Sequence, residues 1–203
     1  MKKYAVLHEP GDIVTLAGTR FVVLDVERRG SLPDSLFLLA LESVGASEFG
    51  SSNNYAESDL KKAVDKWLED MDKRGLDNAK LIPHEIDLTT LDGSGCYGKL
   101  SVKAAPLTLD EAREYADIIP NAERWCWLAT GWSGPSKSDG DGALGVNSNG
   151  DWNGNYCSYA YGIRPALKIP SDLLLDSADK PDLSEVPTDT LLEEIRRRVV
   201  DKA

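Results

Sequence analysis

The order of hydrophobic patterns along the chain constrains its fold most strongly. Residues 12–26 indicate two strands around a turn at Ala17-Gly18, because β-branched and aromatic residues flank a turn-forming glycine. Residues 36–41 form a continuous apolar run typical of a buried strand, and residues 162–169 indicate a final strand. Strands at both ends of a helical middle predict an α+β domain. We expect its N- and C-terminal strands to pair.

Two amphipathic helices are predicted in the middle of the chain. The first begins after Ser58, a residue type that favours the N-cap, and ends near Gly75. The second spans residues 109–118, where Thr108 and Glu111 match a capping box. The apolar stripe of the first helix recurs at helical period and comprises Leu60, Ala63, Val64, Trp67, Leu68 and Met71.

The overall charge of the chain excludes some classes of partner. The 203 residues carry a formal net charge of −11, and this acidic field repels phosphate backbones and anionic lipids. We therefore expect no binding to nucleic acid or to a membrane surface. Membrane insertion is not expected either, because no apolar run approaches the roughly 20 residues that span a bilayer. The apolar stretch at residues 4–7 is too short for a signal-peptide core, which predicts cytoplasmic synthesis.

Few residues in the sequence offer catalytic chemistry. His8 and His84 are the two histidines, and both are expected in ordinary loop positions. Cys126 or Cys157 could act as a reactive thiol, although a small buried residue is the simpler interpretation. The Asp-Gly-Asp-Gly run at 139–142 lacks a downstream acid for calcium and indicates a turn. No catalytic residue, metal site or cofactor is predicted.

The segment 132–161 differs in composition from the rest of the chain. It is dominated by Gly, Ser, Asn, Asp, Tyr and Trp, and a hairpin turn is predicted at Asn149-Gly150. Tyrosine supplies large rigid contacts and Asn or Ser supplies adaptable hydrogen bonds, as in protein-binding loops. The alternative is a glycine-rich loop without a ligand. The predicted ligand-binding residues are Trp132, Ser133, Ser138, Asp139, Asn147, Asn149, Asp151, Trp152, Asn153, Asn155, Tyr156, Ser158, Tyr159 and Tyr161.

Four further residues are predicted to have structural roles. Trp67 belongs to the first helix, and Trp125 and Trp127 lie in the first half of a predicted strand at 125–130. Arg164 is expected to tether a loop by donating hydrogen bonds to backbone carbonyls.

The predicted domain covers residues 1–170, and a different organisation follows. Residues 171–187 are rich in Asp, Ser and Pro and predict a linker. Residues 190–201 predict an amphipathic helix with a capping box at Thr190 and Glu193. This helix could dock on the domain, form an oligomer or join a larger particle.

Three parts of the sequence resemble a known family. They are the N-terminal strand pair beginning at Gly11-Asp12-Ile13, the central helix with Trp67-Leu68, and the ending Gly162-Ile-Arg-Pro-Ala-Leu167. Together they resemble bacterial and bacteriophage domains of the formylglycine-generating-enzyme branch of the C-type-lectin-like fold. This group includes the variable proteins of diversity-generating retroelements. The resemblance covers about residues 10–170.

The resemblance implies a scaffold that binds a ligand, in phages often a receptor on a cell surface. It also implies possible association with a virion. In retroelement-diversified members, adenine-directed mutation yields the Asn, Tyr, Ser, Asp and Gly that abound in residues 147–161. Two alternatives stay open: a metal- and cysteine-dependent oxidase, or a phage assembly protein. The oxidase pattern requires two close cysteines, whereas Cys126 and Cys157 are far apart in the sequence.

Overall fold

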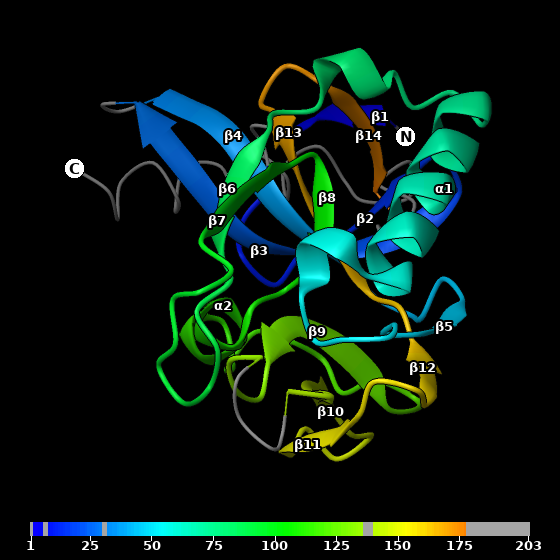
Figure 1. Cartoon of the computed structure of the whole chain (residues 1–203). Helices are drawn as coiled ribbons and strands as arrows, with labels where there is room; N and C mark the ends of the chain where they lie inside the picture. The colour runs from blue at the N-terminus through cyan, green and yellow to red at the C-terminus, as the bar shows by residue number, and fades with distance from the viewer. Residues whose placement is uncertain (1, 6–7, 30–31, 136–139, 178–203) are drawn as a thin grey trace, which may run out of the picture.

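The computed structural model describes residues 2–5, 8–29, 32–135 and 140–177. These residues form two β-sheets, two α-helices and a short two-stranded ribbon, which confirms the predicted α+β class. Figure 1 shows the smaller sheet below the larger one and connected to it by long crossing segments. Ser138, Asp139 and the predicted helix 190–201 lie outside the described residues.

The larger sheet contains the predicted N-terminal hairpin. Ala17 and Gly18 both have positive φ angles, 47° and 77°, which is the backbone geometry of a tight hairpin turn. The sheet has seven strands, in the spatial order β1 (Lys2–Tyr4), β14 (Leu174–Ser177), β2 (Ile13–Leu16), β3 (Thr19–Arg29), β4 (Leu32–Ala40), β13 (Pro165–Pro170) and β8 (Ala104–Pro106).

The two ends of the described chain pair in this sheet, but through a strand that was not predicted. The predicted final strand, now β13, pairs with β4 and β8. The strand that pairs with β1 and β2 is β14, which lies in the predicted linker. The sheet therefore extends to Ser177, beyond the predicted domain end at residue 170.

Both predicted helices are present. α1 (Asp59–Lys73) begins at Ser58, whose side chain accepts a hydrogen bond from the backbone N–H of Lys61. α2 (Leu109–Glu114) has the predicted capping box, but it is shorter than the predicted helix because residues 115–118 form turns. The shorter elements are η2 (Tyr55–Glu57), η3 (Asn78–Lys80) and the ribbon of β6 (His84–Asp87) and β7 (Lys99–Val102). No helix among the described residues is long and apolar enough to cross a membrane.

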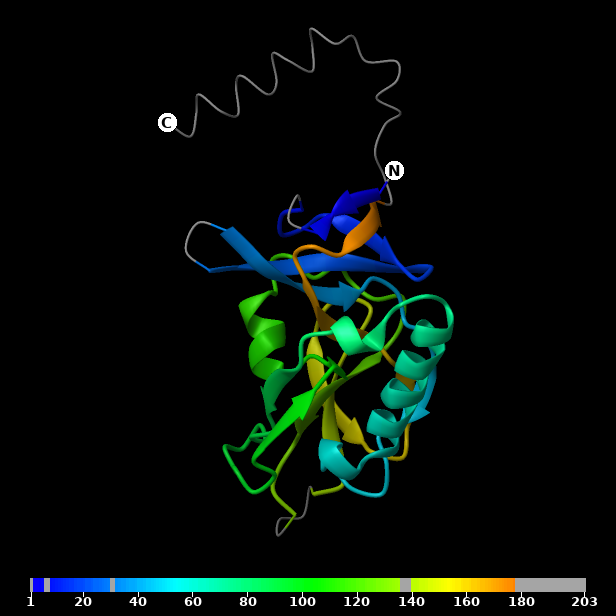
Figure 2. The same cartoon turned by 90° about the horizontal axis from the view of Figure 1, so that it is seen from above.

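The two helices cover opposite faces of the larger sheet, which explains the continuous apolar run in β4. Leu36 and Leu38 point into a core cluster that includes the buried face of α1. Phe37 and Leu39 point into a second cluster with Leu109 of α2. Because successive side chains of a strand alternate between faces, a strand covered on both sides must be apolar throughout. Figure 2 shows the helices on either side of the strands.

The smaller sheet carries the segment singled out in the sequence. Strand β9 is buried along its whole length, and the predicted turn at Asn149-Gly150 joins β10 to β11. The strand order is β11 (Trp152–Tyr156), β10 (Gly142–Val146), β9 (Cys126–Gly131), β12 (Ala160–Gly162) and β5 (Ala46–Glu48). Strand β11 is therefore one edge of this sheet.

Candidate ligand-binding surface

The register of the smaller sheet distributes the aromatic residues over its two faces. A Cβ atom added at Gly154 of β11 would lie 2.1 Å from a ring carbon of Trp132. A Cβ atom added at Gly145 of β10 would instead meet the rings of Trp125 and Tyr161. Gly145 pairs with the neighbour of Gly154, so the two glycines face opposite sides. The aromatic residues of 132–161 therefore do not form one continuous surface.

One set of aromatic rings forms an unbroken series, which we call the aromatic row: Trp125, Tyr161, Tyr159 and Tyr156. The rings of Trp125 and Tyr161 stack with centroids 5.4 Å apart and an interplanar angle of 20°. The centroids of Tyr161 and Tyr159 are 6.3 Å apart, and those of Tyr159 and Tyr156 are 6.0 Å apart. These separations suit favourable aromatic pairs.

The aromatic row runs from the protein interior to solvent. Trp125 and Tyr161 are half-buried, whereas Tyr159 and Tyr156 expose 47% and 59% of their surface. Below Tyr161 lies the buried ring of Trp127, with centroids 4.5 Å apart. Packing thus restricts the freedom of Tyr161, and the ring of Tyr159 lies against this fixed base.

Polar side chains border the aromatic row. The side-chain amide of Asn155 donates a hydrogen bond to the Tyr161 hydroxyl. Asn153 is exposed and, two residues away on β11, faces the same side as Asn155. Ser158 is exposed between the two outer tyrosines. Burial, and secondarily Tyr159, raises the pKa of the Tyr161 hydroxyl.

The loop between β10 and β11 is organised by Asn147. Its side-chain oxygen accepts hydrogen bonds from the backbone N–H groups of Asn149 and Asp151, at 2.8 and 2.9 Å. Its amide nitrogen donates to the Asp151 carboxylate at 3.0 Å. Asn147 therefore shapes the loop, while the side chains of Asn149 and Asp151 are exposed.

Three predicted ligand-binding residues lie elsewhere. Ser133 is buried, which corrects the prediction that its side chain lies on an exposed surface. Trp132 is half-buried beneath Gly154 and packs against the second core cluster. Trp152 exposes 40% of its surface on the face opposite Tyr161 and Trp125, and the guanidinium of Arg113 lies 5.7 Å from its ring centroid.

The residues predicted to be structural divide into two groups. Trp67 packs in the core against Phe21, and the indole N–H of buried Trp127 donates to the Ser47 carbonyl at 3.0 Å. Trp125, by contrast, is half-exposed within the aromatic row. Because Trp125 lies just before β9, alternation along that strand gave no signal of its exposure.

Arg164 is buried and bonds to the backbone. Its Nε donates to the Ala40 carbonyl and its Nη1 donates to the Pro120 carbonyl, both at 3.0 Å. It thus links β4 to the turn that follows α2.

Asn53 supports the base of this region and was not singled out in the sequence. Its amide nitrogen donates to the carbonyls of Ser133 and Gly142, at 2.8 and 2.9 Å. Its side-chain oxygen accepts a 2.6 Å hydrogen bond from the Tyr97 hydroxyl. This buried network anchors the start of β10 to a part of the chain that is distant in the sequence.

The cysteines and histidines do not gather into a site. Cys126 and Cys157 are buried free thiols, and burial raises their pKa values to about 11 and about 12. Both are therefore protonated at neutral pH, unlike an activated nucleophile. Burial lowers the pKa of His84 to about 4. The described part of the chain holds no group of three or more His, Cys, Asp or Glu residues placed to bind a metal ion.

Comparisons with family models, with curated proteins and with solved structures find no match to this chain. Its functional residues are therefore inferred from their own geometry and chemistry.

Proposed function

We propose that this protein is a ligand-binding protein whose contact surface is centred on the aromatic row. The observation that carries the proposal is the gradient of exposure along the row, from the half-buried stack of Trp125 and Tyr161 to the exposed rings of Tyr159 and Tyr156. Exposed aromatic rings on a rigid base lose little conformational entropy on binding, which favours them as contact residues.

The surroundings of the row favour a protein or a cell-surface component as the ligand. Asn153, Asn155 and Ser158 offer neutral donors and acceptors around the rings. The net charge of −11 disfavours a polyanion. These contact residues therefore suit a ligand whose own surface is neutral and carries both hydrogen-bonding groups and apolar patches.

The scaffold we propose is C-type-lectin-like, as in the family that the sequence resembles. Three features support it: the pairing of both chain ends in one sheet, the two helices, and the separate small sheet that carries the contact residues. The structure by itself establishes the broader α+β class.

The same family likeness leads us to propose that this surface is diversified by a retroelement. Asn149, Asp151, Asn153 and Tyr156 are exposed, whereas residues 162–167 are buried, so substitutions at the first set would leave the core intact. A reverse-transcriptase gene and a near-copy of the 3′ coding region beside this gene would support diversification. An isolated gene with a uniform sequence among sister clones would contradict it.

The binding proposal is tested with two defined probe sets, a glycan array and a displayed random-peptide library. The unaltered protein is screened beside the double variant Tyr156→Ala/Tyr159→Ala and the control Leu91→Ala, which truncates an exposed apolar residue outside the row. We expect ligands retained by the protein and the control to be lost by the double variant. Ligands that bind all three proteins equally would contradict the proposal, as would the absence of any ligand in both sets.

The two alternative functions gain no support from the described residues. The raised pKa values of Cys126 and Cys157 are the reverse of what a thiol-based oxidase needs in its resting nucleophile. The assembly alternative rests on residues 190–201, which lie outside the described residues.

A further inference from the structure

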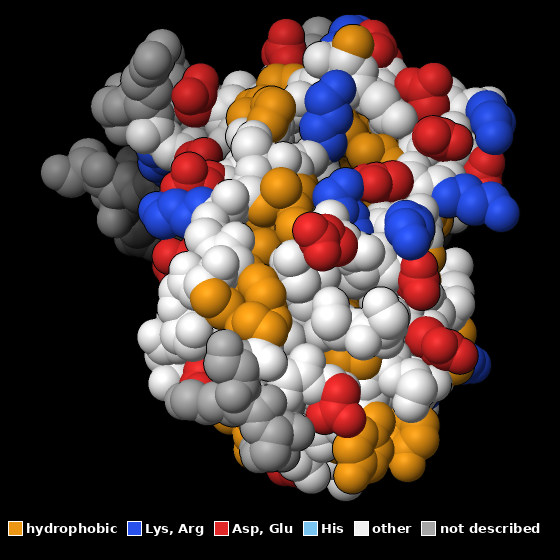
Figure 3. Space-filling view, in the orientation of Figure 1, with side chains coloured by type: hydrophobic (Ala, Val, Ile, Leu, Met, Phe, Trp, Pro, Cys, Tyr) orange, Lys and Arg blue, Asp and Glu red, His pale blue; other side chains and the backbone are white. Residues whose placement is uncertain are grey.

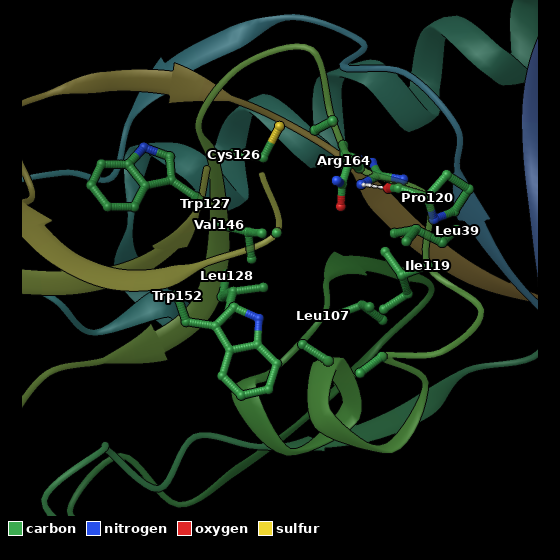
Figure 4. A pocket seen from close by; sticks show the side chains of 15 residues that line it. Leu39, Leu107, Ile119, Pro120, Cys126, Trp127, Leu128, Val146, Trp152 and Arg164 are labelled. Atoms are coloured by element: carbon green, nitrogen blue, oxygen red, sulfur yellow. Dashed lines mark hydrogen bonds between the residues drawn. The ribbon is translucent and has the colours of Figure 1, made fainter. Parts of the chain in front are cut away.

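An apolar pocket lies on the other face of the smaller sheet, between that sheet and the segment around α2. Its free volume is about 90 Å³. Figure 4 shows Trp152 on one side of the pocket and Arg164 on the other, with apolar side chains between them. The residues that line the pocket include Leu107, Ile119, Leu128, Val146, Trp152 and Arg164.

The pocket has the size and the surface of a site for one small apolar group. An engineered apolar cavity of about 150 Å³ binds benzene. This pocket is smaller but partly open, so a single ring or a short branched chain would fill it and extend into its mouth. Small-molecule sites are typically apolar with a few polar groups that fix orientation. Here the polar group that distinguishes one end of the pocket is the guanidinium of Arg164.

Arg164 carries a buried positive charge without an acidic partner in the pocket. The residue exposes 6% of its surface, and two of its nitrogens donate to backbone carbonyls. The third, Nη2, is buried and has no hydrogen-bond partner among the described residues. No Asp or Glu occurs among the described residues that line the pocket. The charge of Glu42 acts on this guanidinium from outside the pocket, but Nη2 keeps no hydrogen-bond partner among the described residues. A buried donor in this state favours an anionic acceptor.

Arg164 is the one cation among the described residues that line the pocket. Arg113 of α2 lies over the ring of Trp152, but it is paired with Asp110 and does not line the pocket. The charge of Arg164 and the apolar walls together favour a small molecule with one apolar part and one negatively charged group.

We propose that this pocket binds a small monocarboxylate, with an aromatic ring or short branched chain in the apolar cavity and the carboxylate toward Arg164. The site is separate from the aromatic row, because Trp152 faces away from Tyr161 and lies at the other end of β11 from Tyr156, and none of the row's tyrosines lines the pocket. The inference therefore does not depend on the function proposed for the row.

The test compares three probes of similar size that share a benzene ring and differ in the charge of their polar group: benzoate, benzyl alcohol and benzylammonium. Each is titrated into the ¹⁵N-labelled full chain, and chemical shifts are followed at the Trp152 indole N–H and the Val146 amide. We expect saturable shifts with benzoate and at least about tenfold weaker binding of benzyl alcohol, because charge-assisted hydrogen bonds are the stronger ones. Benzylammonium should not bind.

A matched pair of variants localises the site without altering Arg164, whose replacement could unfold the protein. Val146→Phe fills the pocket, and Val44→Phe makes the same change at a half-buried valine that does not line it. Benzoate binding should be lost in the first variant and kept in the second. Equal affinity for benzoate and benzyl alcohol, unchanged binding by Val146→Phe, or no saturable shift with benzoate would each overturn the proposal.

Discussion

At the scale of single residues, the site depends on buried polar side chains whose role could not be predicted from the sequence. Asn53 lies 80 residues from Ser133 in the chain, yet it bonds to the carbonyl of that residue. Nothing local to Asn53 indicates this contact, because the partner is set by the tertiary fold. The burial of Ser133 was not predicted for the same reason, because the Gly- and Ser-rich sequence around it resembles an exposed loop.

The substitution Asn53→Ala should destabilise the protein by about 2–4 kcal/mol, because two carbonyls and one hydroxyl would lose buried partners. The measurement is the free energy of unfolding in urea. Asn149→Ala is the matched control: its side chain is exposed, and we expect a change within about 0.5 kcal/mol. Equal effects of the two substitutions would contradict the role given to Asn53.

His84 should make stability depend on pH. Both of its ring nitrogens are buried without a partner, and burial lowers its pKa from 6.5 to about 4. The unfolded state therefore binds a proton that the folded state does not between these values. The free energy of unfolding is therefore unaffected by His84 above pH 6.5 and falls by about 3 kcal/mol as the pH decreases from 6.5 to 4.

The comparison of the unaltered protein with His84→Gln isolates this contribution. The difference in unfolding free energy between the two proteins should be constant above pH 6.5 and should change steadily from 6.5 to 4. Parallel curves across that range would show that His84 is solvated in the folded protein.

At the scale of elements, the sequence predicted most of the regular structure. Capping residues located α1 and α2, and glycine-containing turns located two hairpins, because these signals are local. Strand β14 was missed, since Leu174 and Leu175 form a short apolar stretch among Asp and Ser. Its partners β1 and β2 are distant in the chain, so pairing rather than propensity decides that it is a strand.

Removing β14 should destabilise the domain. A chain ending at Ser177 is compared with one ending at Pro170, both by thermal unfolding. The shorter chain should melt several degrees lower, because β1 loses its pairing partner and β2 loses one of two neighbours. Equal melting temperatures would mean that β14 contributes nothing to the sheet and that residue 170 is the functional end of the domain.

At the scale of the whole molecule, the smaller sheet separates two different surfaces. The aromatic row ends in exposed rings, whereas the separate pocket is partly open, largely apolar and lined at one end by Arg164. Composition alone predicted a binding region at 132–161 but not this division. Strand register assigns each aromatic side chain to a face, and a shift of one residue would reverse the assignment.

The central claim is that the aromatic row binds a ligand. It is tested most directly by the dissociation constants of the tightest peptide or glycan from the screen for the unaltered protein, Tyr159→Ala and Trp152→Ala. Each substitution removes one exposed aromatic ring, Tyr159 from the aromatic row and Trp152 from the wall of the separate pocket. We expect Tyr159→Ala to weaken binding at least about 30-fold, as for a contact worth about 2 kcal/mol or more, and Trp152→Ala to change it less than about threefold. Equal losses, or a loss with Trp152→Ala alone, would contradict the claim.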